Sequence, residues 1–145
     1  MILSAERIGP AISQVFETMY FREALYCGSA TLKLPLLGTA VRFSGSVDGV
    51  FRWAVSERLA AQLAADFLGV ETVGFDAREL ESAIKELANV ACGSTLSAVM
   101  PSGDFHLSLP ETLPIAAGEE EFRHSFSMEG APPEIGFDIA LTKPE

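Results

Sequence analysis

Basic residues, cysteines and long apolar runs are scarce in this chain, and each shortage narrows the functions open to it. Ten Lys and Arg residues stand against twenty Asp and Glu among 145 residues, giving a net charge of −10, and the ten are scattered. Binding a phosphate backbone needs clustered cations, so nucleic acid is a poor partner, and an acidic membrane surface is disfavoured for the same reason. No run reaches the ~20 apolar residues needed to span a bilayer.

Cysteine and histidine also offer little chemistry. Cys27 and Cys92 are too few for a disulfide framework, lack CxxC spacing and have no His and acid at readable spacing, which argues against a thiol enzyme. We expect two reduced, buried thiols. His106 and His124 alternate with apolar residues, as structural strand residues do, so no metal site is predicted in the chain itself. With no basic leader at the N-terminus, a cytoplasmic protein is expected.

The composition, 48% hydrophobic and 21% charged with no linker-like tract, predicts a single globular domain over residues 1–145. Apolar periodicity and cap signals predict three helices within it. They span residues 10–20, with Pro10 in the first turn; residues 56–68, capped by Ser56 and ended by Gly69; and residues 76–100, opened by an Asp76–Glu79 capping box. The second helix is expected to bury Leu59, Leu63 and Phe67 on its inner face.

Strands are predicted where apolar residues alternate between turn signals. A hairpin of residues 39–46 and 50–55 around Asp48-Gly49 is the strongest of these signals. The other candidate strands are residues 30–34, 105–109, 122–128 and 135–142.

One side of the long helix carries a row of polar and small residues. Ser82-x3-Glu86-x2-Asn89 spaces a hydroxyl, a carboxylate and an amide so that, at ~100° per residue, they and Gly93 fall within roughly 60° of one another. Apolar residues fall on the opposite side: Leu80, Ile84, Leu87 and Ala91. Because a helix buries polar side chains only with partners, the row is expected to face water or another molecule.

A faint internal repeat links the first helix to the long one. Ser13-x3-Glu17-x2-Tyr20 has the spacing of the row, and each helix precedes strands with a Phe-Ser pair and a Gly-led apolar run. If the repeat is real, the fold is α+β, with two long helices packed on an antiparallel β-sheet in two halves related by a pseudo-two-fold axis.

With these features the chain resembles the CheC/CheX/FliY-type family of chemotaxis phosphatases. The family signature is an Asp or Ser, then E-x-x-N four residues later, then a Gly, and it stands here as Ser82, Glu86, Asn89 and Gly93. The likeness also covers residues 15–19, 43–50 and 56–69, and is weakest across 21–38 and 101–120. CheC-like members carry the motif on both long helices, whereas Tyr20 stands in place of the first Asn here. A chain with one intact copy of the motif and one degenerate copy is most similar to the CheX-like members.

The resemblance implies a phosphatase acting on the phospho-aspartate of a CheY-like response-regulator receiver, in chemotaxis or related two-component signalling. Asn89 would orient the attacking water, since one amide both donates and accepts hydrogen bonds, and Glu86 would pair with the receiver's active-site lysine. Ser82 would be a rim contact, and Gly93 would permit close approach of the partner backbone. No cofactor is expected in the chain, and Mg²⁺ is expected in the receiver.

The resemblance also implies a homodimer paired through the sheets. An alternative is a non-catalytic adaptor of the same fold that binds a receiver or a flagellar-switch component, because fold alone does not fix activity. The intact Glu86 and Asn89 favour the phosphatase. The alternative to a functional role for Ser82, Glu86, Asn89 and Gly93 is an ordinary solvent-exposed helix face. In that case Gly93 would only allow close packing of the helix. Which receiver is the partner, and whether the output is motility, stays open.

Overall fold

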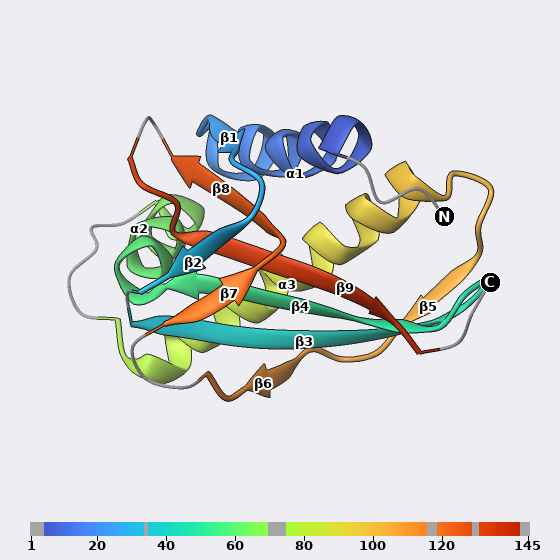
Figure 1. The fold of residues 1–145 in the computed structure, drawn as a ribbon. Coiled ribbons are helices and arrows are strands. Elements are labelled where there is room, and N and C mark those ends of the chain that lie inside the picture. The colour runs from blue at the N-terminus through green and yellow to red at the C-terminus, as the bar shows by residue number, and fades with distance from the viewer. Residues whose placement is uncertain (1–4, 34, 70–74, 116–118, 129–130, 143–145) are drawn as a thin grey trace.

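One antiparallel sheet, with three helices on one of its faces, organises the chain (Figure 1). The computed structural model describes residues 5–33, 35–69, 75–115, 119–128 and 131–142. In these residues the helices are α1 (Ala5–Tyr20), α2 (Glu57–Leu68) and α3 (Ala77–Val99). The strands are β1 (Ala24–Tyr26), β2 (Ala30–Leu32), β3 (Leu36–Gly45), β4 (Gly49–Ser56), β5 (Phe105–Leu107), β6 (Glu111–Leu113), β7 (Glu120–Phe122), β8 (His124–Met128) and β9 (Ile135–Leu141). The predicted α+β class is confirmed.

The predicted hairpin forms as β3 and β4, and it lies near the middle of the sheet. Phe43 pairs with Gly49 at the closed end, where the Gly45 N–H donates to Asp48 Oδ1 at 3.2 Å. Gly45 has a φ of 132°, and a Cβ there would lie 2.1 Å from the carbonyl oxygen of Asp104. Glycine is therefore required at this position by both backbone conformation and space.

The strand order is β1-β8-β9-β4-β3-β5, with β6 pairing elsewhere along the free edge of β3. All pairs are antiparallel. The β8–β9 pair and the β3–β4 hairpin therefore lie next to each other, joined through β9 and β4. This order is compatible with two related halves, and the pseudo-two-fold repeat itself stays a prediction.

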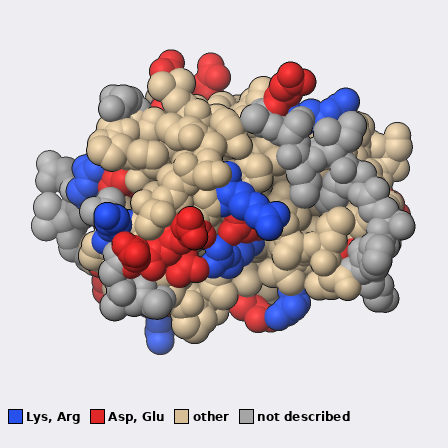
Figure 2. All heavy atoms as spheres, in the orientation of Figure 1, with Lys and Arg blue, Asp and Glu red and all other residues tan. Residues whose placement is uncertain are grey.

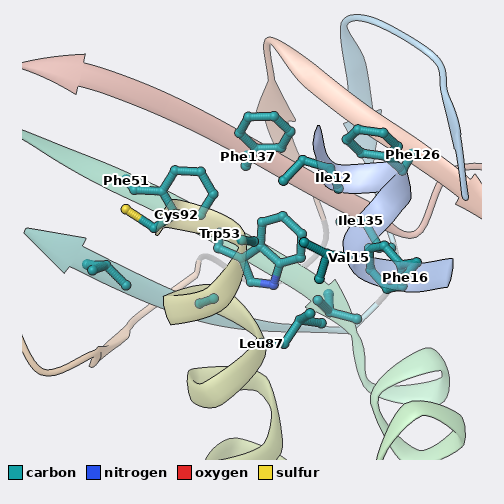
Figure 3. Packing of buried hydrophobic residues seen from close by; sticks show 14 of the residues in the cluster. Ile12, Val15, Phe16, Phe51, Trp53, Leu87, Cys92, Phe126, Ile135 and Phe137 are labelled. Atoms are coloured by element: carbon teal, nitrogen blue, oxygen red, sulfur yellow. The ribbon is translucent and has the colours of Figure 1, made fainter. Parts of the chain in front are cut away.

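Trp53 lies at the centre of the core between the sheet and the helices (Figure 3). Its ring centroid is 5.7 Å from that of Phe51 on the same strand and 5.8 Å from that of Phe137 on β9. The helices cover these rings with buried apolar residues: Ile8, Ile12, Val15 and Phe16 from α1, and Ile84, Leu87, Ala91 and Leu96 from α3. Burial of these sides leaves the polar sides of both helices facing outward.

A small second sheet of β2 and β7 covers part of the helix-free face. Phe122 of β7 packs with Leu32 of β2 in a separate apolar cluster. Arg52 holds this layer in place, since its guanidinium lies 4.6 Å from the Phe122 ring centroid and pairs with Glu120 and Asp138, each at 2.5 Å. Figure 2 shows acidic and basic side chains lying side by side on this face.

Both predicted helix caps are present. Asp76 Oδ1 accepts a hydrogen bond from the Glu79 N–H at 2.8 Å, and Glu79 Oε1 accepts one from the Asp76 N–H at 3.3 Å, which completes the capping box. Ser56 Oγ accepts from the Leu59 N–H at 3.1 Å, and Gly69 ends α2 with a left-handed φ of 69°. The long helix α3 therefore starts where the sequence predicts, and it runs for 23 residues.

Three details of the helices and thiols were predicted wrongly. Already at Ala5 the chain is helical, so Pro10 lies inside α1 rather than in its first turn; full burial of Ile8 favours the helix despite the hydrogen bond lost at proline. Phe67 is 53% exposed rather than buried. Cys27 is exposed, whereas Cys92 is buried as predicted, and burial raises the pKa of the Cys92 thiol to about 12.

The strand predictions also need correction in the second half of the chain. Residues 122–128 divide between β7 and β8, because Phe122 pairs with β2 while the residues from His124 onward pair with β9 and β1. Residues 108–109 lie outside β5, and Leu109 is exposed. The three-residue strands β1 and β6 were not predicted. Residue 34, the last of the predicted strand 30–34, lies outside the described residues.

Candidate functional site

The helix α3 presents the predicted row on its outer side. Ser82, Glu86 and Asn89 are exposed, and Gly93 is half-buried. On the opposite side Ile84, Leu87 and Ala91 are buried against the sheet, while Leu80 is only half-buried. We call Ser82, Glu86, Asn89 and Gly93 the α3 row. Because the helix is capped at its start and packed along its length, these side chains stand on a rigid support.

The polar members of the α3 row have no partner within the part of the chain that the structure describes. Neither Ser82, Glu86 nor Asn89 makes a hydrogen bond or ion pair there. Charged residues next to the row on the same helix are paired instead: Lys85 Nζ lies 3.2 Å from the Oε1 atom of Glu81, one turn earlier. The hydroxyl, carboxylate and amide therefore keep their full hydrogen-bonding capacity for water or a partner.

Helix α1 runs beside α3 in the opposite direction (Figure 1). At one end, Arg7 Nη1 donates to the carbonyl oxygen of Ala98 at 3.2 Å, and at the other end Tyr20 lies beside Glu86. A groove of about 740 Å³ runs between the two helices, and its lining includes Val90 and Gly93. The α3 row thus borders an open, largely apolar groove that was not predicted, because it depends on how two distant helices pack.

Tyr20, which the predicted repeat aligns with Asn89, belongs to the core border as predicted. Its side chain is buried, and the ring centroid lies 5.8 Å from that of Phe16. Burial, followed by the nearby charges of Glu86 and Asp66, raises the pKa of the Tyr20 hydroxyl to about 12. The phenol is therefore neutral at ordinary pH.

The other members of the α1 motif differ from their counterparts in α3. The Ser13 hydroxyl donates to the carbonyl oxygen of Ala24 at 2.7 Å, so it serves the local structure. Glu17 is exposed. With Tyr20 buried, α1 offers a carboxylate without an amide beside it.

Phe67 was missed as a surface residue near the row. Its spacing from Leu59 and Leu63, which are both buried, predicts a place on the inner face of α2. Phe67 instead lines hollows with Ala83 and Glu86 of α3. Its place in the last turn, just before the helix-ending glycine, is the sequence signal that it could lie beyond the core.

Metal ligands and proton carriers are sparse around the row. Within the described ranges, no three His, Cys, Asp or Glu side chains gather closely enough to hold a metal ion. His106 is exposed, and His124 lies in the sheet with Nδ1 2.8 Å from the Tyr26 hydroxyl oxygen. Burial lowers the pKa of His124. None of the helices in the described residues is long and apolar enough to cross a membrane.

Comparison with known proteins gives a consistent result. The family model described as "Chemotaxis phosphatase CheX" matches residues 37–129. A chain of the CheX–CheY–BeF3–Mg²⁺ complex from Borrelia burgdorferi is 19% identical with a TM-score of 0.70, covering 99% of this chain and 100% of that one. A CheC-like superfamily protein from Shewanella sp. PV-4 is 14% identical with a TM-score of 0.71, covering 99% and 100%. FliY from Thermotoga maritima is 16% identical with a TM-score of 0.62, covering 98% and 93%.

At these identities the solved structures show a shared fold and nothing finer. None of the curated proteins compared with the chain matches it.

Proposed function

Since this chain belongs to the CheX family of chemotaxis phosphatases, we propose that it hydrolyses the phospho-aspartate of a CheY-like receiver domain. The observation that carries the proposal is the exposure of Glu86 and Asn89, without partners among the described residues, on one side of a capped helix. A solvated acid and amide at this spacing are what the family signature requires. The Borrelia burgdorferi complex, which contains CheX, CheY, BeF3 and Mg²⁺, supports a receiver as the partner.

Hydrolysis of an acyl phosphate needs a water held in line with the leaving carboxylate. Most of the rate enhancement comes from positioning this water and from stabilising charge in the transition state. In this proposal the receiver supplies Mg²⁺ and a lysine that neutralise the phosphoryl oxygens. Asn89 supplies the orientation of the water, through one amide that donates and accepts. An amide does not take up a proton at neutral pH, so Asn89 acts as a positioning group and not as a general base.

Glu86 lies one turn before Asn89 and is proposed to pair with the receiver's active-site lysine. At ~4 Å and an effective dielectric constant of 20, such a pair is worth about 4 kcal/mol before desolvation. After desolvation, a net ~1–3 kcal/mol of docking specificity remains. Ser82 is proposed as a rim contact, and Gly93 as the place where the partner backbone comes close.

The test is a turnover assay with purified protein. Each receiver domain encoded in the source genome is phosphorylated with acetyl phosphate and Mg²⁺, and phosphate release is followed with and without this protein. Shortening of the phosphate lifetime on one receiver supports the proposal. Binding of a receiver without faster phosphate loss would instead favour the adaptor, a function for which the shared fold with FliY leaves room.

Charge reversal of Glu86 is expected to weaken docking. Glu86→Lys should raise the Kd for the Mg²⁺·BeF3-loaded receiver by on the order of tenfold through like-charge repulsion, and Glu86→Gln should raise it less. The midpoint of thermal unfolding should barely move, because the side chain is exposed. Titration calorimetry provides the measurement, and equal Kd values for wild type and Glu86→Lys would leave Glu86 as a solvated residue without a docking role.

Gly93→Ala separates a partner contact from a packing role. A Cβ at Gly93 would meet only Leu107 Cδ1, at 3.8 Å, which is ordinary van der Waals contact. Replacing a mid-helix glycine should then raise the free energy of unfolding by up to ~1 kcal/mol. If the receiver backbone approaches this position, Gly93→Ala should nevertheless weaken receiver binding. A more stable protein with unchanged receiver affinity would remove Gly93 from the interface.

A further inference from the structure

A hollow of about 340 Å³ lies between α2 and the first half of α3, directly beside the α3 row. Its lining combines two aromatic rings, Phe67 and Phe75, with the polar side chains of Ser82 and Glu86. The hollow therefore shares two residues with the proposed active surface and adds an apolar patch to it. The mechanism proposed above uses neither aromatic ring.

Arg78 extends the same helical line beyond the row. Arg78, Ser82 and Glu86 are spaced i, i+4 and i+8 on α3, which places them on one side of the helix over about 12 Å. Among the described residues neither Arg78 nor Glu86 makes an ion pair, whereas Glu81 and Lys85 pair with each other at 3.2 Å. Arg78 and Glu86 thus line the same hollow without an ion pair of their own among the described residues, while Arg78 lies close enough to Glu81 to help lower the pKa of that carboxyl.

Phe67 is the most exposed of the rings that line this hollow. More than half of its surface, 53%, is open to solvent. Its neighbour Asp66 is paired with Arg22, which follows α1, so that the last turn of α2 is held against the rest of the molecule. Exposed aromatic side chains have few rotatable bonds, and aromatic residues are enriched among those that dominate interface energies.

We infer that this hollow is the pocket in which the receiver docks, an inference that rests on the function proposed above. The Phe67 and Phe75 rings take an apolar side chain of the receiver. Glu86 pairs with a receiver lysine at one end, and Arg78 pairs with a receiver carboxylate at the other. The matching surface on the receiver is an apolar side chain flanked by opposite charges about 12 Å apart, and this arrangement discriminates between receivers through complementary charge.

Steady-state kinetics test this inference, using the phosphorylated receiver on which the wild-type protein acts fastest. Phe67→Ala is expected to raise KM for that receiver by about tenfold while kcat stays within about twofold, since Phe67 takes no part in orienting water. Arg78→Glu is expected to raise KM in the same way, and more strongly at low salt. This change places an acid in the first turn of α3, which the helix dipole favours, and it removes the attraction of Arg78 for Glu81, so the unfolding midpoint of the variant is measured alongside its KM.

Phe21→Ala is the matched control. Phe21 is 91% exposed, and it lines a separate hollow with Ser13 and Glu17. This variant should keep the wild-type KM. Wild-type KM values for both Phe67→Ala and Arg78→Glu would overturn the inference while leaving the phosphatase proposal intact. If the wild-type protein shortens the phosphate lifetime of no receiver, the proposed function itself fails, and the docking pocket fails with it.

Discussion

Asn89→Ala is expected to lower the rate of receiver dephosphorylation by on the order of 10²-fold, as for other groups that orient a reacting water or oxyanion. The structure gives the amide no hydrogen-bond partner among the described residues, so its removal leaves no buried group unsatisfied. The unfolding midpoint and the affinity for the Mg²⁺·BeF3-loaded receiver should therefore stay near the wild-type values. Phosphate release in single turnover measures the effect on the chemical step directly.

Two companion variants sharpen this result. Asn89→Asp keeps the size of the side chain but removes its hydrogen-bond donors, so a comparable loss of rate is expected if the amide must both donate and accept. Lys85→Ala, one turn away, loses only a surface ion pair with Glu81 and should keep its rate. Near wild-type turnover by Asn89→Ala would remove this residue from the mechanism.

Tyr20→Ala is expected to lower the free energy of unfolding by ~2–4 kcal/mol, because the ring is buried beside Phe16 in the core. The folded fraction should keep its phosphatase rate, since Asn89 and Glu86 remain in place on α3. Chemical denaturation combined with the turnover assay checks both parts. A stable Tyr20→Ala protein without activity would mean that α1 is part of the surface that binds the receiver or carries out the reaction.

The hydroxyl of Tyr20 makes the free energy of unfolding depend on pH, which the ring alone would not do. Its pKa of about 12 in the folded protein lies above the ordinary value of 10.0, so the folded state holds the proton more tightly than the unfolded state. The stability that this difference contributes is fully present below pH 10 and is lost as pH rises through 12, by on the order of 3 kcal/mol. Tyr20→Phe should lack this part of the decline. Cys92 also titrates in this range, but it is present in both proteins and cancels in the difference.

The parts of the fold that could be predicted from sequence are those determined by nearby residues. The Asp76–Glu79 capping box, the Gly69 stop and the hairpin around Gly49 each depend on contacts within a few positions, and the structure contains all three. Strands β1 and β6 could not be predicted, because neither lies within a longer run of alternating apolar residues such as those that contain β2 and β5, and their pairing partners, β8 and β3, are distant in the chain.

The candidate site divides in the same way. The α3 row follows from helical spacing alone, so its exposure was predictable. Phe67 has the spacing of an inner-face residue, and its exposure follows from its place in the last turn of α2 together with the packing of α2 against α3. The groove between α1 and α3 likewise exists only once two helices more than fifty residues apart lie side by side.

Among the described residues Glu86 and Asn89 make no hydrogen bond or ion pair, so folding and the proposed chemistry depend on different residues of this chain. Substitution at either position costs the native state almost nothing, so selection for a folded protein does not retain these groups. Tyr20 of α1 shows the opposite case, since its ring is buried at the border of the core and its loss is expected to destabilise the fold. On the function proposed above, a mutational scan read out as protein abundance is expected to pass over Glu86 and Asn89, whereas the same scan read out as signalling is expected to single them out.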